Sequence, residues 1–341
     1  MKILVTGGTG YIGSHTVVEL QSKGYEVIIV DDLSNSSIEV LDNIAKISGK
    51  RPLFEKFNLV DPDKTYAFFK LHSDISAVIH FAAHKAVGES VELPLMYYRN
   101  NIASLVNILQ GMISNNIRDI VFSSSCTVYG QPDTLPVSEE TAVQKAASPY
   151  GNTKQICEEI ITDTSFSSNI RGILLRYFNP IGAHETALIG ELPLGVPNCL
   201  MPYITQAASG KRPFLRVWGH DYDTPDGTAI RDYIHVVDLA KAHVIAVERL
   251  CNANGKDKIE TFNLGTGNGY SVLEVIKSFE KTSGVKLKYE LNDRRPGDVV
   301  KIWADTSLAN NELGWKAEKG LDEMTDSAWK WEMALANKIA K

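Results

Sequence analysis

The chain has few cysteines, and they form no cluster. Cys126, Cys157, Cys199 and Cys251 are widely separated among 341 residues, and no two of them have the short spacing of a zinc site or a redox motif. This distribution argues against a disulfide framework and against a cysteine-ligated metal. We therefore expect reduced thiols, no metal site and a cytoplasmic location.

Long apolar runs and basic blocks are also missing. No stretch of about 18 apolar residues occurs, so we expect no transmembrane helix. The first residues, MKILVTGG, contain an apolar run that is too short for a signal peptide and long enough for a strand. The net charge of −6 and the absence of a Lys/Arg block argue against a nucleic-acid partner.

What the sequence does contain is an alternation of short β-branched runs and amphipathic segments. Helical periodicity appears in Tyr11–Ser22 and Met96–Ile113. Such alternation is typical of an α/β fold with a doubly wound parallel sheet, the Rossmann architecture. The predicted strands are Lys2–Val5, Glu26–Val30, Ser76–His80, Asp119–Ser123 and Gly172–Tyr177.

Beyond about residue 180 the pattern is interrupted by Pro- and Gly-rich stretches. We expect residues 1–180 to form a dinucleotide-binding domain and residues 181–341 mainly a smaller α/β substrate lobe, with about 230–265 returning to the main sheet. A small molecule would bind between them. The predicted helices here are Leu200–Ser209, Val236–Leu250, Ser271–Lys281 and Leu321–Leu335, and the predicted strands are Leu215–Trp218 and Glu260–Leu264.

A glycine motif follows the first predicted strand directly. The stretch VTGGTGYIG contains Gly7, Gly8, Gly10 and Gly13 and opens the first helix. Glycines there allow a tight turn and let backbone N–H groups approach a pyrophosphate at the helix N-terminus. Asp31 ends the second predicted strand, where a carboxylate accepts hydrogen bonds from a ribose 2′-OH and repels a 2′-phosphate. The pattern therefore predicts NAD rather than NADP.

The motif YxxxK occurs twice, as Tyr66–Lys70 and as Tyr150–Lys154. Tyr66 lies on an ordinary amphipathic segment, which indicates helix packing. Tyr150 follows a buried strand that ends in three serines, and Ser-Pro before it starts a helix, so Tyr150 and Lys154 share one helical face. An ammonium about 6 Å away would lower the phenol pKa by about two units. We predict that Tyr150 acts as a general base assisted by a strand-end serine.

With these motifs the chain resembles the extended short-chain dehydrogenase/reductases, and within them the UDP-hexose 4-epimerases. The resemblance covers essentially the whole chain, through VTGGTGYIGSHT, VIHFAAHKAVGES, YYRNN, FSSSCTVYG, SPYGNTK, LRYFNPIGAH, LMPYITQ, DGTAIRDYIHVVDLA and NLGTGNGYSVLEV. It implies interconversion of UDP-galactose and UDP-glucose with bound NAD, through transient oxidation at C4 and return of hydride to the opposite face of a 4-keto intermediate.

The resemblance also implies which residues form the site. Ser125, Tyr150 and Lys154 would be catalytic. The residues expected to bind NAD are Gly7, Gly10, Tyr11, Ile12, Gly13, Asp31, Asp32, Leu33, Ser34, Asn35, Ser36, Asn58, Leu59, Phe81, Ala82, Ala83, His84, Lys85, Asn100, Tyr150, Lys154 and Phe178. Those expected to bind the UDP-sugar are Ser125, Tyr150, Tyr177, Asn179, Cys199, Leu200, Trp218, Arg231, Arg295, Asp298 and Ile302. Arg231 and Arg295 are the expected diphosphate partners.

Three positions depart from the pattern of that family. Asn58 stands where Asp is more common, and its carbonyl oxygen can still accept a hydrogen bond from adenine. Cys199 stands where Asn is usual, which puts one polar contact to the nucleotide sugar in question. Ile302 stands where a bulky Tyr or a smaller Cys or Ser gates an N-acetyl group, so acceptance of N-acetylated UDP-hexoses stays open.

Other functions stay in view beside this one. A UDP-N-acetylglucosamine or dual-specificity 4-epimerase is one alternative. A nucleotide-sugar 4,6-dehydratase would need an Asp-Glu pair where Cys126 and Thr127 stand. A non-catalytic NAD-sensing protein would need no catalytic trio. Apolar residues beyond one stripe on Met96–Ile113 and Tyr150–Thr162, together with the resemblance, imply a homodimer with a four-helix interface.

Overall fold

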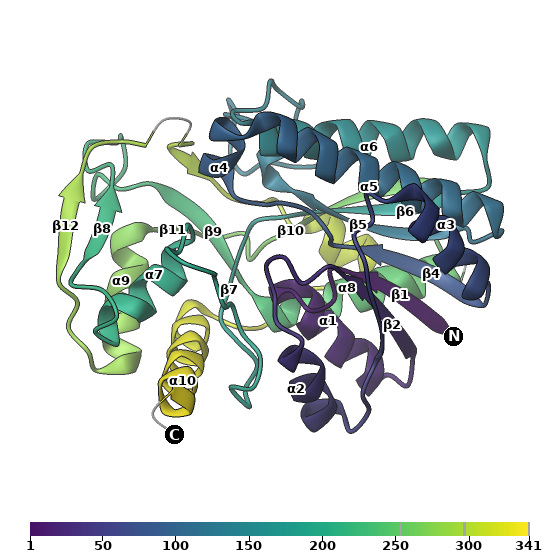
Figure 1. The fold of residues 1–341 in the computed structure, drawn as a ribbon. Coiled ribbons are helices and arrows are strands. Elements are labelled where there is room, and N and C mark those ends of the chain that lie inside the picture. Colours follow the sequence, from purple (N-terminus) through teal and green to yellow (C-terminus); the bar gives the residue numbers. More distant parts are fainter. Residues whose placement is uncertain (253, 296–297, 340–341) are drawn as a thin grey trace.

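The structure is a computed structural model that describes residues 1–252, 254–295 and 298–339. Within them, a parallel seven-stranded sheet has the order β10-β6-β5-β4-β1-β2-β3 (Figure 1). Its strands are β1 (Lys2–Thr6), β2 (Glu26–Asp31), β3 (Leu53–Lys56), β4 (Ile75–His80), β5 (Asp119–Ser125), β6 (Arg171–Tyr177) and β10 (Ile259–Leu264). The direction of winding reverses between β1 and β4, so a crevice forms at their carboxyl ends, where such sheets bind ligands.

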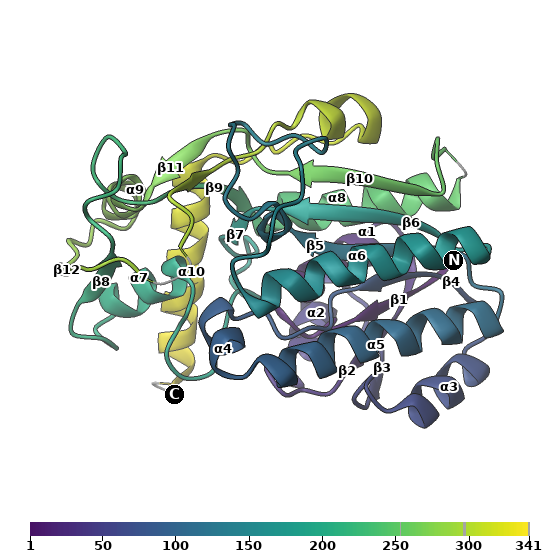
Figure 2. The same ribbon diagram turned by 90° about the horizontal axis from the view of Figure 1, so that it is seen from above.

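Helices cover both faces of this sheet (Figures 1 and 2). One face packs against α1 (Tyr11–Ser22), α2 (Glu39–Ser48) and α8 (Val236–Cys251). The other face packs against α3 (Pro62–Leu71), α5 (Pro94–Ser114) and α6 (Pro149–Ser167), and a short helix, α4 (Val87–Glu92), precedes α5. The β-branched strand residues are buried on both faces, which explains their near-continuous apolar runs.

A smaller lobe lies beside the carboxyl ends of the strands (Figure 1). It contains a small sheet of β7, β9, β11 and β13, a β8–β12 pair, and helices around a core of their own. The bounds are β7 (Asn179–Ile181), α7 (Leu200–Ala208), β8 (Leu215–Trp218), β9 (Ile230–His235), β11 (Gly269–Ser271), α9 (Val272–Ser283), β12 (Tyr289–Asn292), β13 (Lys301–Ile302) and α10 (Leu321–Ile339). Within the segment 230–265, β9 belongs to this lobe and β10 to the main sheet.

The predicted fold class is confirmed, and the predicted strands and long helices match observed elements to within about two residues, except that α10 extends beyond Leu335. The sequence analysis missed β3 because LFEK is a mostly exposed edge strand without a β-branched run. All four cysteines are free thiols. Among the described residues, no group of three or more His, Cys, Asp or Glu could hold a metal ion, and no helix is long and apolar enough to cross a membrane.

Candidate active site

The glycine motif forms a turn between β1 and α1 that leaves no room for side chains. Gly7 has φ +68°, and a Cβ there would lie 2.9 Å from the backbone nitrogen of Ala82. A Cβ on Gly13 would overlap the carbonyl oxygen of Gly7. The free N-terminus of α1 therefore faces an open backbone cradle that suits a pyrophosphate.

Asp31 lies beside this turn, at the end of β2. Its carboxylate accepts hydrogen bonds from the backbone N–H of Thr9 (3.2 Å) and of Leu33 (2.9 Å) and from the Ser36 hydroxyl (3.2 Å). The bond to Thr9 fixes the carboxylate next to the glycine turn, where a ribose would meet it. Thr9 also shares a 2.7 Å hydrogen bond with Ser36. Sequence reasoning missed Thr9 because a backbone donor carries no residue-type signal.

The predicted adenine residues lie on the next loop. The Asn58 side chain donates to Asp32 Oδ2 (3.0 Å), and its carbonyl oxygen accepts from the backbone N–H of Val60 (2.9 Å). The oxygen expected to bind adenine is thus already engaged locally. Leu59 is buried in the core beneath the loop. An adenine contact by Asn58 stays a prediction.

The loop after β4, residues 81–85, is pinned by a residue that the sequence analysis did not select. The Asn101 amide accepts from the backbone N–H of His84 (2.8 Å) and donates to the His84 carbonyl (3.0 Å) and to Thr153 (3.1 Å). The predicted neighbour, Asn100, donates to Asn101 Oδ1 (3.2 Å). The helical phase of α5 could have distinguished them, because it turns Asn101 into the core.

Tyr150, Lys154 and Ser125 converge as predicted at the carboxyl end of β5. Ser148 caps α6 by accepting from the Gly151 N–H (3.2 Å), so Tyr150 falls in the first turn. Lys154 Nζ lies 5.9 Å from the centre of the Tyr150 ring and donates to the Ser123 carbonyl (2.5 Å). Ser125 ends the strand, and its hydroxyl accepts from the Thr127 N–H (3.2 Å).

The pKa of the Tyr150 phenol corrects one expectation. Although the residue keeps partial exposure, loss of water around the phenol raises its pKa to about 12, and a hydrogen bond with Ser125 and the charge of Lys85 oppose this rise. The prediction that Lys154 brings this pKa towards neutrality is wrong for the chain alone. Burial also lowers the pKa of Lys154 to about 8. Lys154 therefore still carries its positive charge at pH 7, but its charge is not among the main causes that set the pKa of Tyr150.

A buried ion pair fixes α6 against the sheet. Arg176 on β6 donates to both carboxylate oxygens of Glu158 on α6, at 3.0 and 2.7 Å, and also to the Tyr129 hydroxyl (3.1 Å). The Ser124 hydroxyl, next to Ser125, donates to the same carboxylate. These residues hold α6, which carries Tyr150, in register with the end of β5, which carries the serines. Sequence reasoning missed them because their partners come from separate elements.

The predicted diphosphate residues gather in the smaller lobe, from elements far apart in the chain. Arg231 Nη2 on β9 lies 3.8 Å from Asp298, and Arg295 Nε lies 4.0 Å from the same carboxylate. The Arg295 guanidinium lies 5.5 Å from the ring centre of Trp218 at the end of β8. Two cations, one carboxylate and an aromatic ring thus form a group suited to a nucleoside diphosphate.

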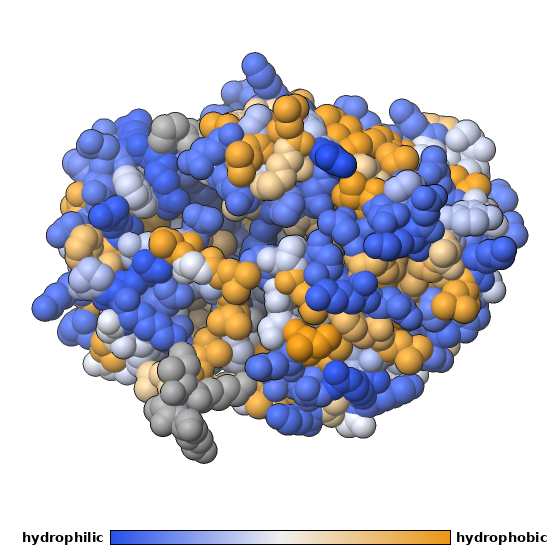
Figure 3. Space-filling view, in the orientation of Figure 1, coloured by the Kyte–Doolittle hydropathy of each residue, from blue (hydrophilic) through white to orange (hydrophobic). Residues whose placement is uncertain are grey.

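The remaining predicted substrate residues come from several elements, and Tyr177 and Ile302 among them are buried. Tyr177 shares a hydrogen bond with Ser123, and Asn179 begins β7 with its side chain exposed. Cys199 is exposed where α7 begins, followed by the half-buried Leu200. Ile302 is buried in a cluster with Phe178 and the aliphatic residues around them. Figure 3 shows the surface hollowed between the two lobes.

Comparisons with known proteins agree with this geometry. The family model for GDP-mannose 4,6 dehydratase matches residues 4–328. A UDP-glucose 4-epimerase from Bacillus subtilis is 50% identical over 99% of this chain and 98% of its own length.

Two solved structures are also similar over 99% of both chains. A UDP-glucose 4-epimerase from Bifidobacterium longum in complex with NAD+ and UDP is 46% identical, with a TM-score of 0.95. Another from Stenotrophomonas maltophila, with bound NAD and formylated UDP-arabinopyranose, is 47% identical, also with a TM-score of 0.95.

Proposed function

This chain belongs to the family described by the GDP-mannose 4,6 dehydratase model and, within it, to the UDP-glucose 4-epimerases, and from that premise we propose that it interconverts UDP-galactose and UDP-glucose. The observation that carries the proposal is the convergence of a phenol, an ammonium and a strand-end hydroxyl at the carboxyl end of β5, in the same sheet whose β1 leads into the glycine turn. The enzyme is an NAD-dependent isomerase that acts on nucleotide sugars.

NAD fits the residues present. The cradle left by Gly7 and Gly13 would hold the pyrophosphate, and Asp31 would accept hydrogen bonds from a ribose. When bound, NAD accepts a hydride from the sugar C4 and later returns it. The loops that surround the cradle, Asp31–Ser36 and Phe81–Lys85, would contact the remainder of the dinucleotide.

Tyr150 would act as the general base that takes the proton of the sugar 4-OH. Ser125 would hydrogen-bond the same sugar oxygen and, by bonding the phenol, stabilise the phenolate. Lys154 would support the phenolate and hold the nicotinamide ribose. Burial is the main cause that raises the phenol pKa to about 12, and bound NAD would supply a positive charge that opposes this rise.

The smaller lobe would hold the nucleotide end of the substrate. Arg231 and Arg295 would bind the diphosphate, while the sugar must stay loosely held so that the 4-keto intermediate can turn its other face. Tight nucleotide contacts and loose sugar contacts are both required. Whether the site also accepts N-acetylated hexoses depends on the space beside Ile302.

The dehydratase alternative lacks its acid/base pair. The two residues after Ser125 are Cys126, whose pKa burial raises to about 12, and Thr127, whose hydroxyl is buried without a hydrogen-bond partner. Neither can exchange a proton near neutral pH. We also propose a homodimer that pairs α5 and α6 of each chain, and a cytoplasmic location, which rests on the reduced thiols.

A coupled assay tests the function. Purified protein with UDP-galactose should form UDP-glucose, which UDP-glucose dehydrogenase then oxidises with a visible change in NADH absorbance. Tyr150→Phe should lower kcat by about 10²- to 10⁴-fold because the general base is lost. No turnover by the wild type would refute the epimerase assignment and favour the NAD-sensing alternative, whereas unchanged turnover by Tyr150→Phe would show that Tyr150 is not the general base.

A further inference from the structure

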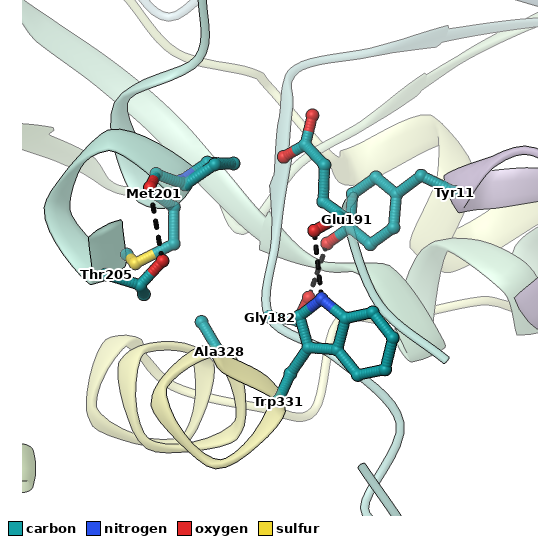
Figure 4. Close-up of a pocket in the computed structure, with 8 residues that line it drawn as sticks. Tyr11, Gly182, Glu191, Met201, Thr205, Ala328 and Trp331 are labelled. Atoms are coloured by element: carbon teal, nitrogen blue, oxygen red, sulfur yellow. Dashed lines mark hydrogen bonds between the residues drawn. The ribbon is translucent and has the colours of Figure 1, made fainter. Parts of the chain in front are cut away.

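The segment between β7 and α7, which belongs to the smaller lobe, contacts the main domain at Tyr11 (Figure 4). The Tyr11 hydroxyl, on α1, donates to the Gly182 carbonyl (2.6 Å). The Trp331 indole N–H, on α10, donates to the Glu191 carbonyl (2.9 Å). A Cβ on Gly190 would lie 2.6 Å from the Trp331 ring. The segment is therefore held to the glycine-turn helix at Gly182 and to the last helix at Glu191.

From this fixed backbone the Glu191 side chain reaches the other lobe. Its carboxylate accepts a hydrogen bond from Lys85 Nζ (3.0 Å), which comes from the loop after β4. The Glu191 side chain is only 12% exposed, whereas that of Lys85 is 48% exposed. The nearly buried Glu191 carboxylate is thus held in place by its surroundings. The Lys85 side chain, in contrast, would move freely in solvent without this ion pair.

Hydrogen bonds place the loop that carries Lys85 beside the first turn of α6: Asn101 bonds both the His84 carbonyl and Thr153, whose hydroxyl donates to the Tyr150 carbonyl (2.7 Å). The charge of Lys85 lowers the pKa of Tyr150 and of Tyr177 against the larger effect of burial. The charge of Glu191, in turn, is the main cause that raises the pKa of Cys199 to about 12. Lys154, by contrast, donates to the Ser123 carbonyl. The position of the Lys85 ammonium therefore bears directly on the phenol.

We propose that Glu191 is a positioning residue for the reaction, whose carboxylate crosses the lobe junction to hold the Lys85 ammonium facing the active site. This inference rests on the proposed epimerase function. A half-exposed lysine without a partner samples many rotamers, and its average field at the phenol falls. Because Lys85 is half-exposed, its ammonium regains water when the Glu191 charge is removed, so this removal should affect catalysis much more than folding.

The test compares Glu191→Gln, Glu191→Asp, Lys85→Met and the double variant Lys85→Met/Glu191→Gln in the coupled assay. The amide keeps the volume and the backbone contact to Trp331 but removes the charge. We expect Glu191→Gln to lower kcat about tenfold with KM within about twofold of the wild type. Glu191→Asp, which keeps the charge, should recover part of the loss. The double variant should be no slower than Lys85→Met.

A matched control is Glu318→Gln, which breaks the exposed ion pair between Glu318 and Lys241 (3.2 Å) without touching the site and should leave kcat unchanged.

An unchanged kcat in Glu191→Gln, or losses from Lys85→Met and Glu191→Gln that multiply in the double variant, would overturn the proposal while the wild-type epimerase activity stands. If Glu191→Gln melts far below the wild type, the kcat of Glu191→Asp decides: wild-type turnover overturns the proposal, and an intermediate value supports it. If the wild type fails to turn over UDP-galactose, the proposed function itself fails.

Discussion

Two tyrosines of this chain precede a lysine by four residues, and their surroundings are opposite. Tyr66 lies on α3 with 58% of its surface exposed. Tyr150 lies in the first turn of α6, beside a strand end. The sequence distinguished them through the serines and the Ser-Pro around Tyr150, which are local signals. It could not give the pKa of the phenol, because the residues that exclude water from the phenol are distant from Tyr150 in the chain.

The same limit applies to Glu191 and Lys85. Their ion pair joins residues 106 positions apart. No local pattern marks either residue as a partner of the other, because the pairing depends on how the lobes dock. By contrast, Gly7, Gly13 and Asp31 could be selected from the sequence, since all belong to one β-α-β unit whose spacing is fixed by geometry. Local motifs were predictable, and contacts across the lobe junction were not.

Ile302 offers a prediction about substrate choice. It is 4% exposed and packs against Phe178 and Val128. A tyrosine there would extend beyond this cluster towards the sugar and occupy the space an N-acetyl group needs. Ile302→Tyr should lower kcat/KM for UDP-N-acetylgalactosamine at least tenfold relative to that for UDP-galactose. This factor is expected for a steric clash that costs about 1–3 kcal/mol.

The measurement is turnover of both substrates by the wild type, Ile302→Tyr and Ile302→Ala. Ile302→Ala should change the ratio in the opposite direction because it opens the same space. Equal ratios in all three proteins would show that this position does not gate the sugar.

At the scale of elements, helix α6 connects folding to chemistry. Its first turn carries Tyr150, its second carries Lys154, and Glu158 ties it to β6. In the sequence, Ser148 and Pro149 predict the start of this helix, because both residue types are typical of helix N-termini. The strands β8, β10 and those of the first half, except the exposed edge strand β3, were predictable from β-branched runs. The short strands β7, β11 and β13 were not, because each has only two or three residues and forms through distant partners.

Ser148 therefore has a role in both stability and turnover. Its hydroxyl accepts from the Gly151 N–H, and Ser148→Ala should cost about 0.5–2 kcal/mol of unfolding free energy. Because the fraying turn contains Tyr150, we also expect kcat to fall several-fold with little change in KM. Urea unfolding and steady-state kinetics measure the two effects.

Ser271→Ala provides the matched control. Ser271 caps α9 with a full capping box, in the smaller lobe. Its loss should cost a similar amount of stability and leave kcat near the wild-type value. Equal kinetic losses in both variants would mean that weakened folding, not the position of Tyr150, lowers the rate.

At the scale of the whole molecule, apolar side chains lie at the surface over the helices α4 to α6 (Figure 3). Leu95 is 81% exposed and Phe166 is 80% exposed. Burial of such residues between two copies would gain about 25 cal/mol per Å² of apolar surface. The broad apolar face of the two long helices in the sequence predicted apolar side chains at this surface. The packed structure was needed to show which of these residues stay exposed.

The dimer proposal predicts the effect of charge on this face. Val106 on α5 is partly exposed, and Val106→Glu should convert a dimer of 37.6 kDa chains to monomers, since an unpaired carboxylate would be buried in the interface. Light scattering after size exclusion measures the mass. Leu71→Glu, on the exposed end of α3, is the control that should stay dimeric. A monomeric wild type would end the proposal.

The fold also buries four histidines in the neutral form, and this makes the whole molecule sensitive to acid. Burial lowers the pKa of His15, His80 and His235 to about 3 and that of His243 to about 4. In the unfolded chain each would titrate near 6.5. Between these values the unfolded state binds more protons than the folded state, so the stability that neutral burial provides is complete above about pH 6.5 and is lost as the pH falls.

Each such histidine should cost about 1.4 kcal/mol of unfolding free energy per pH unit below its unfolded pKa. Urea unfolding at pH 7.5, 6 and 5 should therefore show a steep loss of stability. His80→Gln keeps a group that can bond Thr6, whose hydroxyl lies 2.8 Å from His80 Nδ1, and should reduce that slope by about one proton. His220→Gln, at an exposed position, should leave the slope unchanged. A histidine that is neutral when buried must release its proton on folding, so its removal must change the slope of stability against pH. If His80→Gln has the wild-type slope, the burial of neutral His80 is not a cause of the acid sensitivity.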